Sequence, residues 1–209
     1  SREKRTRFPI EVLTKVQHVV AEKEASHFII GYRFSPEEIE EPGIRFEDTM
    51  FLLNTLAEYK PDYFHISANS YQRTSIVNQE DTEPLINKYL KMQSAQLAKI
   101  PLIGVGSIAQ RQDAEHALEL GYDLLSVGKA YLVEPQWTDK ISQNEEVEQF
   151  VDIHDQKVLH ISSPLWKVMD FMILDKEEEH RKYERLKALQ NKKVKFNKGT
   201  YHVLSLIHI

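Results

Sequence analysis

The sequence predicts an α/β fold built on a parallel sheet. Four short apolar runs alternate with four segments of helical periodicity, an order that favours parallel strands joined by right-handed crossover helices. The runs are apolar almost throughout, which predicts a sheet covered on both faces. The chain has 209 residues, of which 41% are hydrophobic and 28% charged, as is typical of a globular protein with a sizeable core.

The predicted elements follow one another over the first 128 residues. Apolar residues spaced by three and four predict four helices, over 8–24, 46–59, 84–97 and 110–120. The apolar runs predict four strands, over 28–34, 62–67, 101–106 and 123–128. Pro84 suits the first turn of a helix, and Gly121 suits the position just after one. A long polar loop, 68–83, joins the second strand to the third helix.

Beyond about residue 135 this alternation stops. Residues 164–174 are apolar enough to dock on another surface. Residues 175–198 are highly charged, with acidic residues first and basic residues last, an order that suits a helix dipole. We predict a solvated helix there; the alternative is a nucleic-acid contact through its basic end.

Composition narrows the classes of function. The chain has 27 basic and 32 acidic side chains, a net charge of −5, which favours no nucleic-acid partner. It has no cysteine, which excludes disulfides, thiolate zinc sites and iron–sulfur ligation, and no metal site is predicted. No apolar run reaches the roughly 20 residues of a membrane helix. These features predict a cytoplasmic protein that acts on a small molecule.

Two strand ends carry glycines in a pattern typical of phosphate binding. Gly104-Val105-Gly106-Ser107 ends the third predicted strand, and Gly128-Lys129 ends the fourth. Glycines let backbone N–H groups approach an anion, and the loops after the last two strands of a (β/α)₈ barrel often bind phosphate. The alternative is that Gly104 and Gly106 only relieve crowding in a tight turn. Spacing alone does not decide between the two.

Three further side chains are candidates for a site. Arg33 lies within an apolar strand and needs an anionic or carbonyl partner, or a carboxylate on a neighbouring strand. His65 also lies on a strand, where a hydrogen-bonded structural histidine is the more common case than a catalytic one. Tyr71 follows in the long loop and could line a substrate pocket, although an ordinary loop tyrosine is the more common case.

Five segments in series resemble the old yellow enzyme family of FMN-dependent NAD(P)H:flavin oxidoreductases. Residues 31–37, GYRFSPE, resemble the family's GVRLSPEE strand, and residues 62–67, DYFHIS, resemble DYLHVS. Residues 101–108, PLIGVGSI, resemble IPVIGVGGI, and 123–130, DLLSVGKA, with Pro135 after them, resemble DLVAVGRALLADP. The start, SREKRTRF, resembles GGSLENRARF. The likeness covers roughly residues 1–141.

The resemblance implies an FMN site on a (β/α)₈ barrel. It places Arg33 at the N1/C2-carbonyl edge of the flavin ring, where a cation stabilises the reduced flavin. It assigns the phosphate to Gly104, Val105, Gly106, Ser107, Gly128 and Lys129. The family usually has arginine at Lys129, and lysine lacks the forked grip on phosphate. The implied chemistry is hydride transfer from NAD(P)H to FMN and then to an acceptor such as an α,β-unsaturated carbonyl.

The resemblance also predicts that part of the barrel is missing. An eight-stranded barrel takes about 250 residues, and the four strands here resemble the second half. The family's substrate-binding histidine pair has no counterpart, because His154 and His160 are too far apart, so the catalytic acid is unassigned. We therefore expect the C-terminal half of a barrel over 1–141 and a helical extension over 142–203. Residues 204–209 read like a translated transposase-adapter sequence.

Alternatives remain at this point. A non-flavin phosphate-binding barrel would share the glycine-bearing strand ends. An iron–sulfur relative would need cysteines, and an RNA-modifying flavin barrel would need a basic face. A half-barrel would also expose two sheet edges, so an inert domain that forms a homodimer is the non-enzymatic alternative.

Overall fold

The computed structural model describes residues 2–147, 150–151, 162–167 and 194–195. The chain divides into two compact units. The first comprises residues 1–107 and 114–126, and the second comprises residues 108–113 and 127–209.

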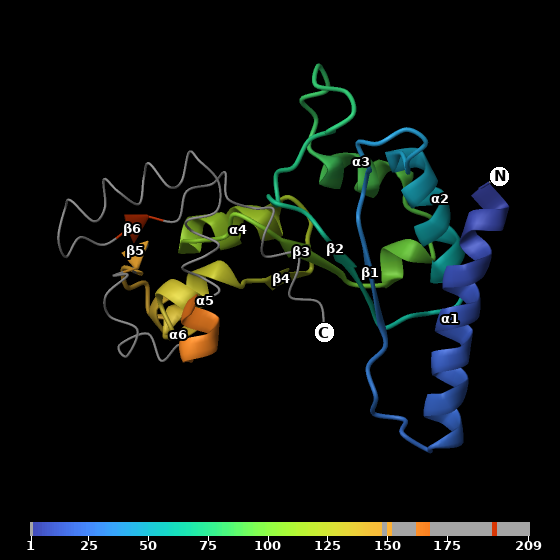
Figure 1. The fold of residues 1–209 in the computed structure, drawn as a ribbon, viewed down its shortest axis with the longest axis horizontal. Helices are drawn as coiled ribbons and strands as arrows, with labels where there is room; N and C mark the ends of the chain where they lie inside the picture. The colour runs from blue at the N-terminus through green and yellow to red at the C-terminus, as the bar shows by residue number, and fades with distance from the viewer. Residues whose placement is uncertain (1, 148–149, 152–161, 168–193, 196–209) are drawn as a thin grey trace. The chain divides into compact units, whose positions relative to one another are not determined.

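The first unit is built on a four-stranded parallel sheet in the order β1-β2-β3-β4 (Figure 1). The strands are β1 (Gly31–Phe34), β2 (Tyr63–Ile66), β3 (Leu102–Val105) and β4 (Leu124–Ser126). Every pair of neighbours is parallel, as predicted. The strands are shorter than predicted, because the ends of the apolar runs lie outside them. Phe28 and Ile29, for example, precede β1 and are 58% and 69% exposed.

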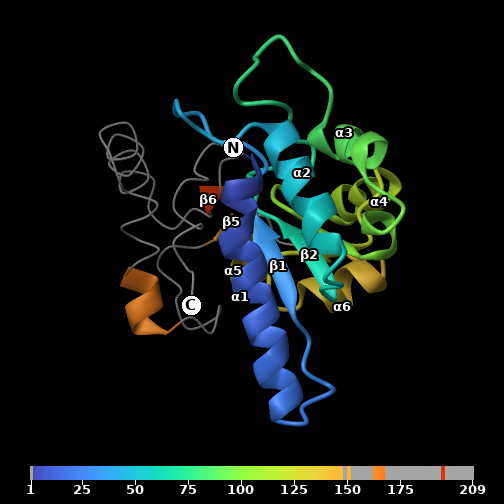
Figure 2. The same cartoon turned by 90° about the vertical axis from the view of Figure 1, so that its right-hand side faces the viewer.

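Helices connect these strands. They are α1 (Arg2–Glu22), α2 (Phe46–Ala57), α3 (Leu85–Met92), the short 3₁₀ helix η1 (Leu97–Lys99) and α4 (Arg111–Glu119). Helix α1 begins well before the predicted residue 8 and includes Pro9. It lies beside α2 (Figures 1 and 2). Arg2 and Arg5 of α1 both pair with Asp48 of α2, at 2.5 and 2.9 Å, which joins the two helices at one end.

Among the described residues, the two faces of the sheet differ in burial. Burial alternates along β1, β2 and β3. The covered face carries Phe34, Phe64, Ile66 and Leu102, which are at most 6% exposed. The opposite face, called the open face below, carries residues that are half-buried or exposed, namely Gly31, Arg33, Tyr63, His65, Ile103, Val105, Leu124 and Ser126. Apolar side chains occur on both faces, so composition alone could not show which face is the more buried.

The core lies between the covered face and the helices. Met50, Leu53 and Leu56 of α2 are at most 1% exposed, as are Leu85 and Ile86 of α3. Burying an aliphatic side chain of this size stabilises a fold by about 1.5–3 kcal/mol. The predicted apolar stripes are therefore confirmed in part, because Leu90 of α3 is 39% exposed and Phe51 and Leu52 of α2 are only half-buried.

The second unit contains α5 (Lys129–Val133), α6 (Trp137–Ser142), β5 (Phe150–Val151) and β6 (Val194–Lys195). Trp137 is 5% exposed, and its indole Nε1 donates a 2.8 Å hydrogen bond to the Ala109 carbonyl oxygen. Strands β5 and β6 form an antiparallel pair, so the extension, which we expected to be helical, also contains strands. Residues 163–167 are helical. Most of the predicted charged helix, and residues 204–209, lie outside the described residues.

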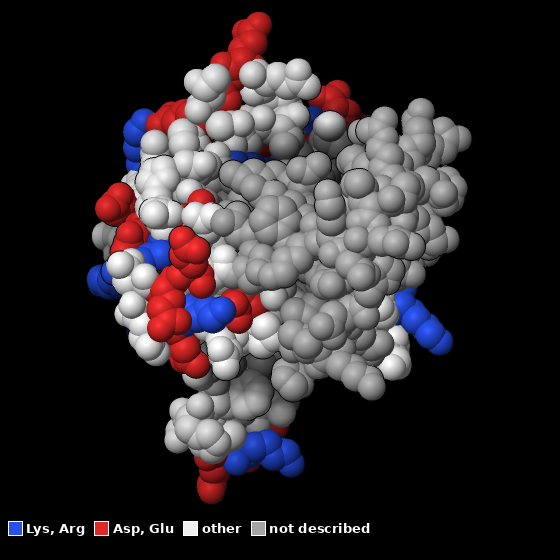
Figure 3. Space-filling model, turned by 90° about the vertical axis from the view of Figure 1, so that its left-hand side faces the viewer, with Lys and Arg blue, Asp and Glu red and all other residues white. Residues whose placement is uncertain are grey.

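The described surface carries both signs of charge. On the face drawn in Figure 3, acidic and basic side chains are interspersed. Within the described part of the chain, no helix is both long enough and apolar enough to cross a membrane.

Candidate functional site

Arg33 and His65 lie side by side on the open face of the sheet. Arg33 of β1 and His65 of β2 are register partners in neighbouring parallel strands, so their side chains leave the sheet on the same side. Ile103 of β3 continues the row. Arg33 is exposed, whereas His65 is half-buried. The structure thus brings together the two strand residues that the sequence singled out separately.

The sequence favoured a hydrogen-bonded structural role for His65, and the structure differs from this expectation. The Nε2 atom of His65 is buried and has no hydrogen-bond partner among the described residues. Burial lowers the pKa of His65, and the nearby guanidinium of Arg33 lowers it further. The ring is therefore neutral at physiological pH, with one nitrogen shielded from water. An unsatisfied buried polar atom of this kind costs about 1–3 kcal/mol and is often found at a ligand site.

The glycine-bearing turn after β3 packs against the chain itself. Gly106 has a φ of +95°, and a Cβ there would lie 2.5 Å from the carbonyl carbon of Asn69. A Cβ on Gly104 would lie 2.6 Å from the ring of Tyr122. Both glycines therefore relieve crowding, as the alternative to phosphate binding expected. That geometry does not exclude a phosphate contact through their backbone atoms.

The loop after β2 is fastened to this turn. The Tyr71 amide donates to the Gly106 carbonyl oxygen at 3.0 Å, and the Ser107 hydroxyl donates to the Asn69 carbonyl oxygen at 3.1 Å. Ser107 also adopts a positive φ of 57°, which is uncommon for a residue with a side chain. The turns after β2 and β3 thus form one hydrogen-bonded structure at the carboxyl end of the sheet, where ligands bind in folds of this class.

Tyr71 is buried in this structure and does not line an open pocket. It is 5% exposed, and its hydroxyl lies 3.3 Å from His116 Nδ1. Its carbonyl oxygen accepts a 3.0 Å hydrogen bond from the Tyr122 hydroxyl. The expectation of an ordinary tyrosine fits better than that of a pocket residue. Sequence reasoning missed its partners, because neither His116 nor Tyr122 lies near it in the chain.

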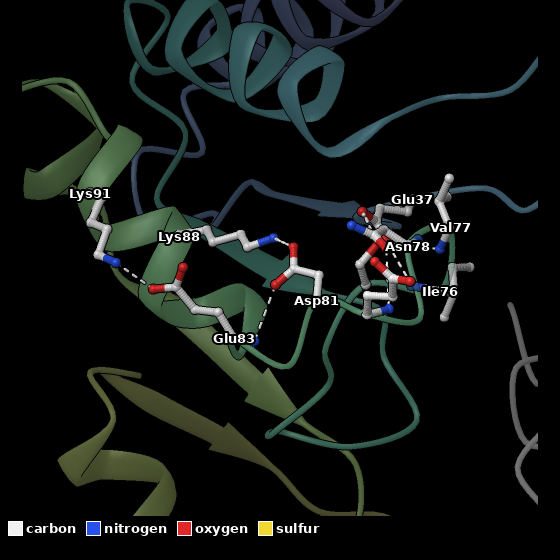
Figure 4. A network of polar contacts seen from close by, with 10 residues as sticks. Glu37, Ile76, Val77, Asn78, Asp81, Glu83, Lys88 and Lys91 are labelled. Carbon is white, nitrogen blue, oxygen red and sulfur yellow. Dashed lines mark hydrogen bonds and ion pairs between the residues drawn. The ribbon is translucent and has the colours of Figure 1, made fainter.

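Glu37 was also missed, and it organises the long loop 68–83. Glu37 is 7% exposed, and its carboxylate accepts hydrogen bonds from the Ser75 hydroxyl at 3.1 Å and the Ile76 amide at 2.9 Å. The Ser75 oxygen in turn accepts from the amides of Val77 and Asn78, at 3.2 and 3.0 Å (Figure 4). One buried carboxylate after β1 therefore holds the loop after β2. Its signal in the sequence is a glutamate directly after the Ser35-Pro36 strand stop.

The same loop is fastened at its far end by ion pairs with α3. Lys88 pairs with Asp81, and Lys91 pairs with Glu83 (Figure 4). The loop is thus held by Glu37 at its middle and by α3 at its end, so it is an ordered part of the carboxyl end of the sheet.

Gly128 and Lys129 fall in the second unit. Gly128 precedes α5, and a Cβ built on it meets no atom of the described residues within 4 Å. Crowding therefore does not explain this glycine, unlike Gly104 and Gly106. Lys129 is the first residue of α5.

Comparison with known proteins decides the family. The family model described as "NADH:flavin oxidoreductase / NADH oxidase family" matches residues 1–148. The chain belongs to the NADH:flavin oxidoreductase / NADH oxidase family. The resemblance to old yellow enzymes is thereby confirmed, and the non-flavin phosphate barrel is not favoured. FMN is the cofactor of this family, and NADH-type nucleotides are its reductants.

Relatives place the segment within longer proteins. The chain is 58% identical over 199 residues to the NADH:acrylate oxidoreductase of Vibrio harveyi, covering 95% of this chain and 20% of that protein. It is 48% identical over 178 residues to the NADH:fumarate oxidoreductase of Klebsiella pneumoniae, covering 84% and 19%. The chain thus spans about a fifth of the length of these two relatives.

A solved structure supports the fold. Morphinone reductase superposes with a TM-score of 0.50 at 18% identity, over 72% of this chain and 38% of that one. Partial coverage of this barrel protein fits a half-barrel. In a closed barrel, the inward-facing residues of each strand meet those of the remaining strands.

The residues on the open face fit an FMN ring edge. Arg33 is a cation on this face, and the shielded Nε2 of His65 beside it is a polar atom without a partner among the described residues. A flavin's pyrimidine edge offers hydrogen-bonding groups and collects negative charge on reduction, so both features match it chemically. Within the described residues no cluster of three or more potential metal ligands occurs.

Proposed function

We propose that this chain is the FMN-binding half of an NAD(P)H-dependent flavin oxidoreductase. The observation that carries the proposal is the pair of Arg33 and His65 on the open face of a parallel sheet, in a chain of this family. Residues 1–141 are proposed as the second half of the (β/α)₈ barrel and residues 142–203 as an extension to it. We propose further that residues 204–209 are not native.

Each site residue has a defined role in this proposal. When bound, FMN supplies hydride acceptance and donation. Arg33 places a positive charge beside the ring edge that becomes negative, and thereby favours reduction. The neutral ring of His65 adds a polar contact without adding charge, because its lowered pKa keeps it unprotonated. The group that donates the proton to the acceptor is not assigned to any residue of this chain.

Phosphate binding is proposed for the two glycine-bearing strand ends. Backbone groups of residues 104–107 would hold the phosphate, joined by Gly128 and by the ammonium of Lys129. No atom of the described part of the chain lies within 4 Å of a Cβ built on Gly128, which supports room for a ligand there. Lys129 holds the charge but makes one point contact where arginine would make two, so we expect weaker phosphate binding than arginine would give.

The proposed acceptor is an electron-poor double bond conjugated to a carbonyl. Acrylate and fumarate, which appear in the names of two relatives, belong to this class. The comparisons do not favour the alternative of an inert half-barrel. A homodimer through β1 and β4, the two edge strands of the four-stranded sheet, is a further proposal. The cytoplasmic location remains a prediction from composition.

The proposal is tested by replacing Arg33 with methionine in protein expressed from the complete coding sequence. We expect FMN to remain bound, its reduction potential to fall, and the rate of flavin reduction by NADH to fall about a hundredfold, as when one stabilising donor is removed. Arg7→Met is the matched control, because Arg7 is exposed and pairs with Glu11 in the same helix. An unchanged potential in Arg33→Met would rule out the role given to Arg33. A monodisperse dimer without flavin would favour the inert alternative.

A further inference from the structure

Arg73 is a cation held in place without a hydrogen-bonding partner for its side chain. It lies in the loop between β2 and α3 and is half-buried. Its Nε is buried, and no acceptor for it occurs among the described residues. The ion pairs of the described chain do not include Arg73 either. A guanidinium normally directs five N–H donors at acceptors in a rigid fork.

The backbone on both sides of Arg73 is fixed. Its amide donates to the Ser70 carbonyl oxygen at 3.1 Å, and its carbonyl oxygen accepts from the Leu85 amide at 2.8 Å. Two residues earlier, the Tyr71 amide is bonded to the Gly106 carbonyl oxygen. Arg73 therefore belongs to the hydrogen-bonded structure that joins the turns after β2 and β3, at the carboxyl end of the sheet.

Glu37 only partly balances this cation. Its charge raises the pKa of Arg73, against the larger opposing effect of burial. Both carboxylate oxygens of Glu37 already accept hydrogen bonds, one from the Ser75 hydroxyl and one from the Ile76 amide. Glu37 thus orients the loop that carries Arg73, while the N–H groups of Arg73 keep no acceptor in the described structure.

We propose that Arg73 binds an oxyanion, the phosphate or carboxylate group of a ligand, at the carboxyl end of the sheet. Arginine suits this role because its planar fork matches both groups with two parallel hydrogen bonds. The location suits it because ligands of parallel α/β folds bind beyond the carboxyl ends of the strands. A nucleotide diphosphate and a small carboxylate are the two sources of this chemistry.

The test is anion binding to the flavin-loaded protein expressed from the complete coding sequence. ADP-ribose serves as the diphosphate probe and acrylate as the carboxylate probe, with dissociation constants measured by calorimetry. We expect Arg73→Met to weaken one of the two at least tenfold, which also identifies the source. Arg73→Lys should weaken the same probe less, because it keeps the charge without the fork. Arg7→Met, which removes an exposed arginine of α1, should change neither.

A thermal readout separates binding from a structural role. Because the Arg73 side chain has no hydrogen-bond acceptor among the described residues, Arg73→Met should leave the melting temperature without anion unchanged or raised. The probe should raise the melting temperature of the wild type and not that of the variant. Dissociation constants for both probes within twofold of wild type would overturn the proposal, as would a variant that melts several degrees lower and binds both equally weakly. Flavin content, measured on the same samples, reports separately on the FMN site.

Discussion

Replacing Glu37 with alanine should release the long loop 68–83 from the sheet. Glu37 is 7% exposed, and its carboxylate accepts hydrogen bonds from the Ser75 hydroxyl and the Ile76 amide. Both donors would lose their acceptor in a region that is largely shielded from water. The Ser75 hydroxyl would also lose the partner that orients its oxygen toward the amides of Val77 and Asn78.

The size of the effect follows from these two contacts. A hydrogen bond to a charged group contributes about 1.5–3 kcal/mol, so the pair holds the loop by about 3 kcal/mol or more. Since about 1.4 kcal/mol is a factor of ten in an equilibrium constant, opening of the loop should become roughly a hundredfold more frequent. Hydrogen–deuterium exchange of a peptide spanning residues 70–80 measures this directly, because exchange follows the free energy of local opening.

The neighbouring glutamate provides the control. Glu38 is exposed, and its carboxylate accepts one hydrogen bond, from the Ile44 amide at 2.9 Å. Glu38→Ala should therefore leave exchange in residues 70–80 unchanged. Exchange in Glu37→Ala that rises less than threefold would refute the reasoning that Glu37 holds this loop.

Three further predictions concern the site. The pKa of His65, followed by proton NMR, should lie below the ordinary value of about 6.5 and should rise in Arg33→Gln. The stability that the neutral ring contributes is lost as the pH falls below the ordinary value, because the unfolded chain then binds the proton first. A pKa of His65 at or above the ordinary value would contradict this reasoning. Gly106→Ala should lower the free energy of local unfolding by about 1–3 kcal/mol, because the residue at this position has a positive φ. Gly128→Ala should leave the free energy of local unfolding unchanged but reduce FMN retention. Equal exchange protection in the two variants would argue against this difference. Lys129→Arg should tighten FMN binding several-fold in a fluorescence titration, and weaker binding would argue against a phosphate contact at this position.

Local pattern was enough to predict the parallel sheet. The apolar runs around β2 and β3 and the helical spacing of α2 place these elements within a few residues of their observed bounds. Gly121 ends its helix region with a φ of +110°, as a glycine after a helix should. The face that each strand buries was not predictable, because apolar residues on a barrel's inner face look the same as those under helices.

The site was only partly predictable, for a related reason. Arg33 and His65 were each conspicuous as polar residues within apolar strands, but only the register shows that they are neighbours. Glu37 and Tyr122 act through partners far away in the sequence, and no spacing rule connects them. Nothing in the sequence pattern singles out Arg73 either. The glycines of the turn after β3 had two interpretations from the sequence. The structure shows that a side chain at either position would collide with neighbouring atoms, and the phosphate role stays a prediction.

The most direct test of the central claim is the FMN content of two purified proteins, one from the complete coding sequence and one of residues 1–209 alone. FMN is released by acid and quantified by its absorbance. We predict close to one FMN per chain in the complete protein and little in residues 1–209 alone, because we propose that this segment forms half of the barrel. A complete protein without FMN would contradict the proposed function. Stoichiometric, tightly held FMN on residues 1–209 would contradict the half-barrel.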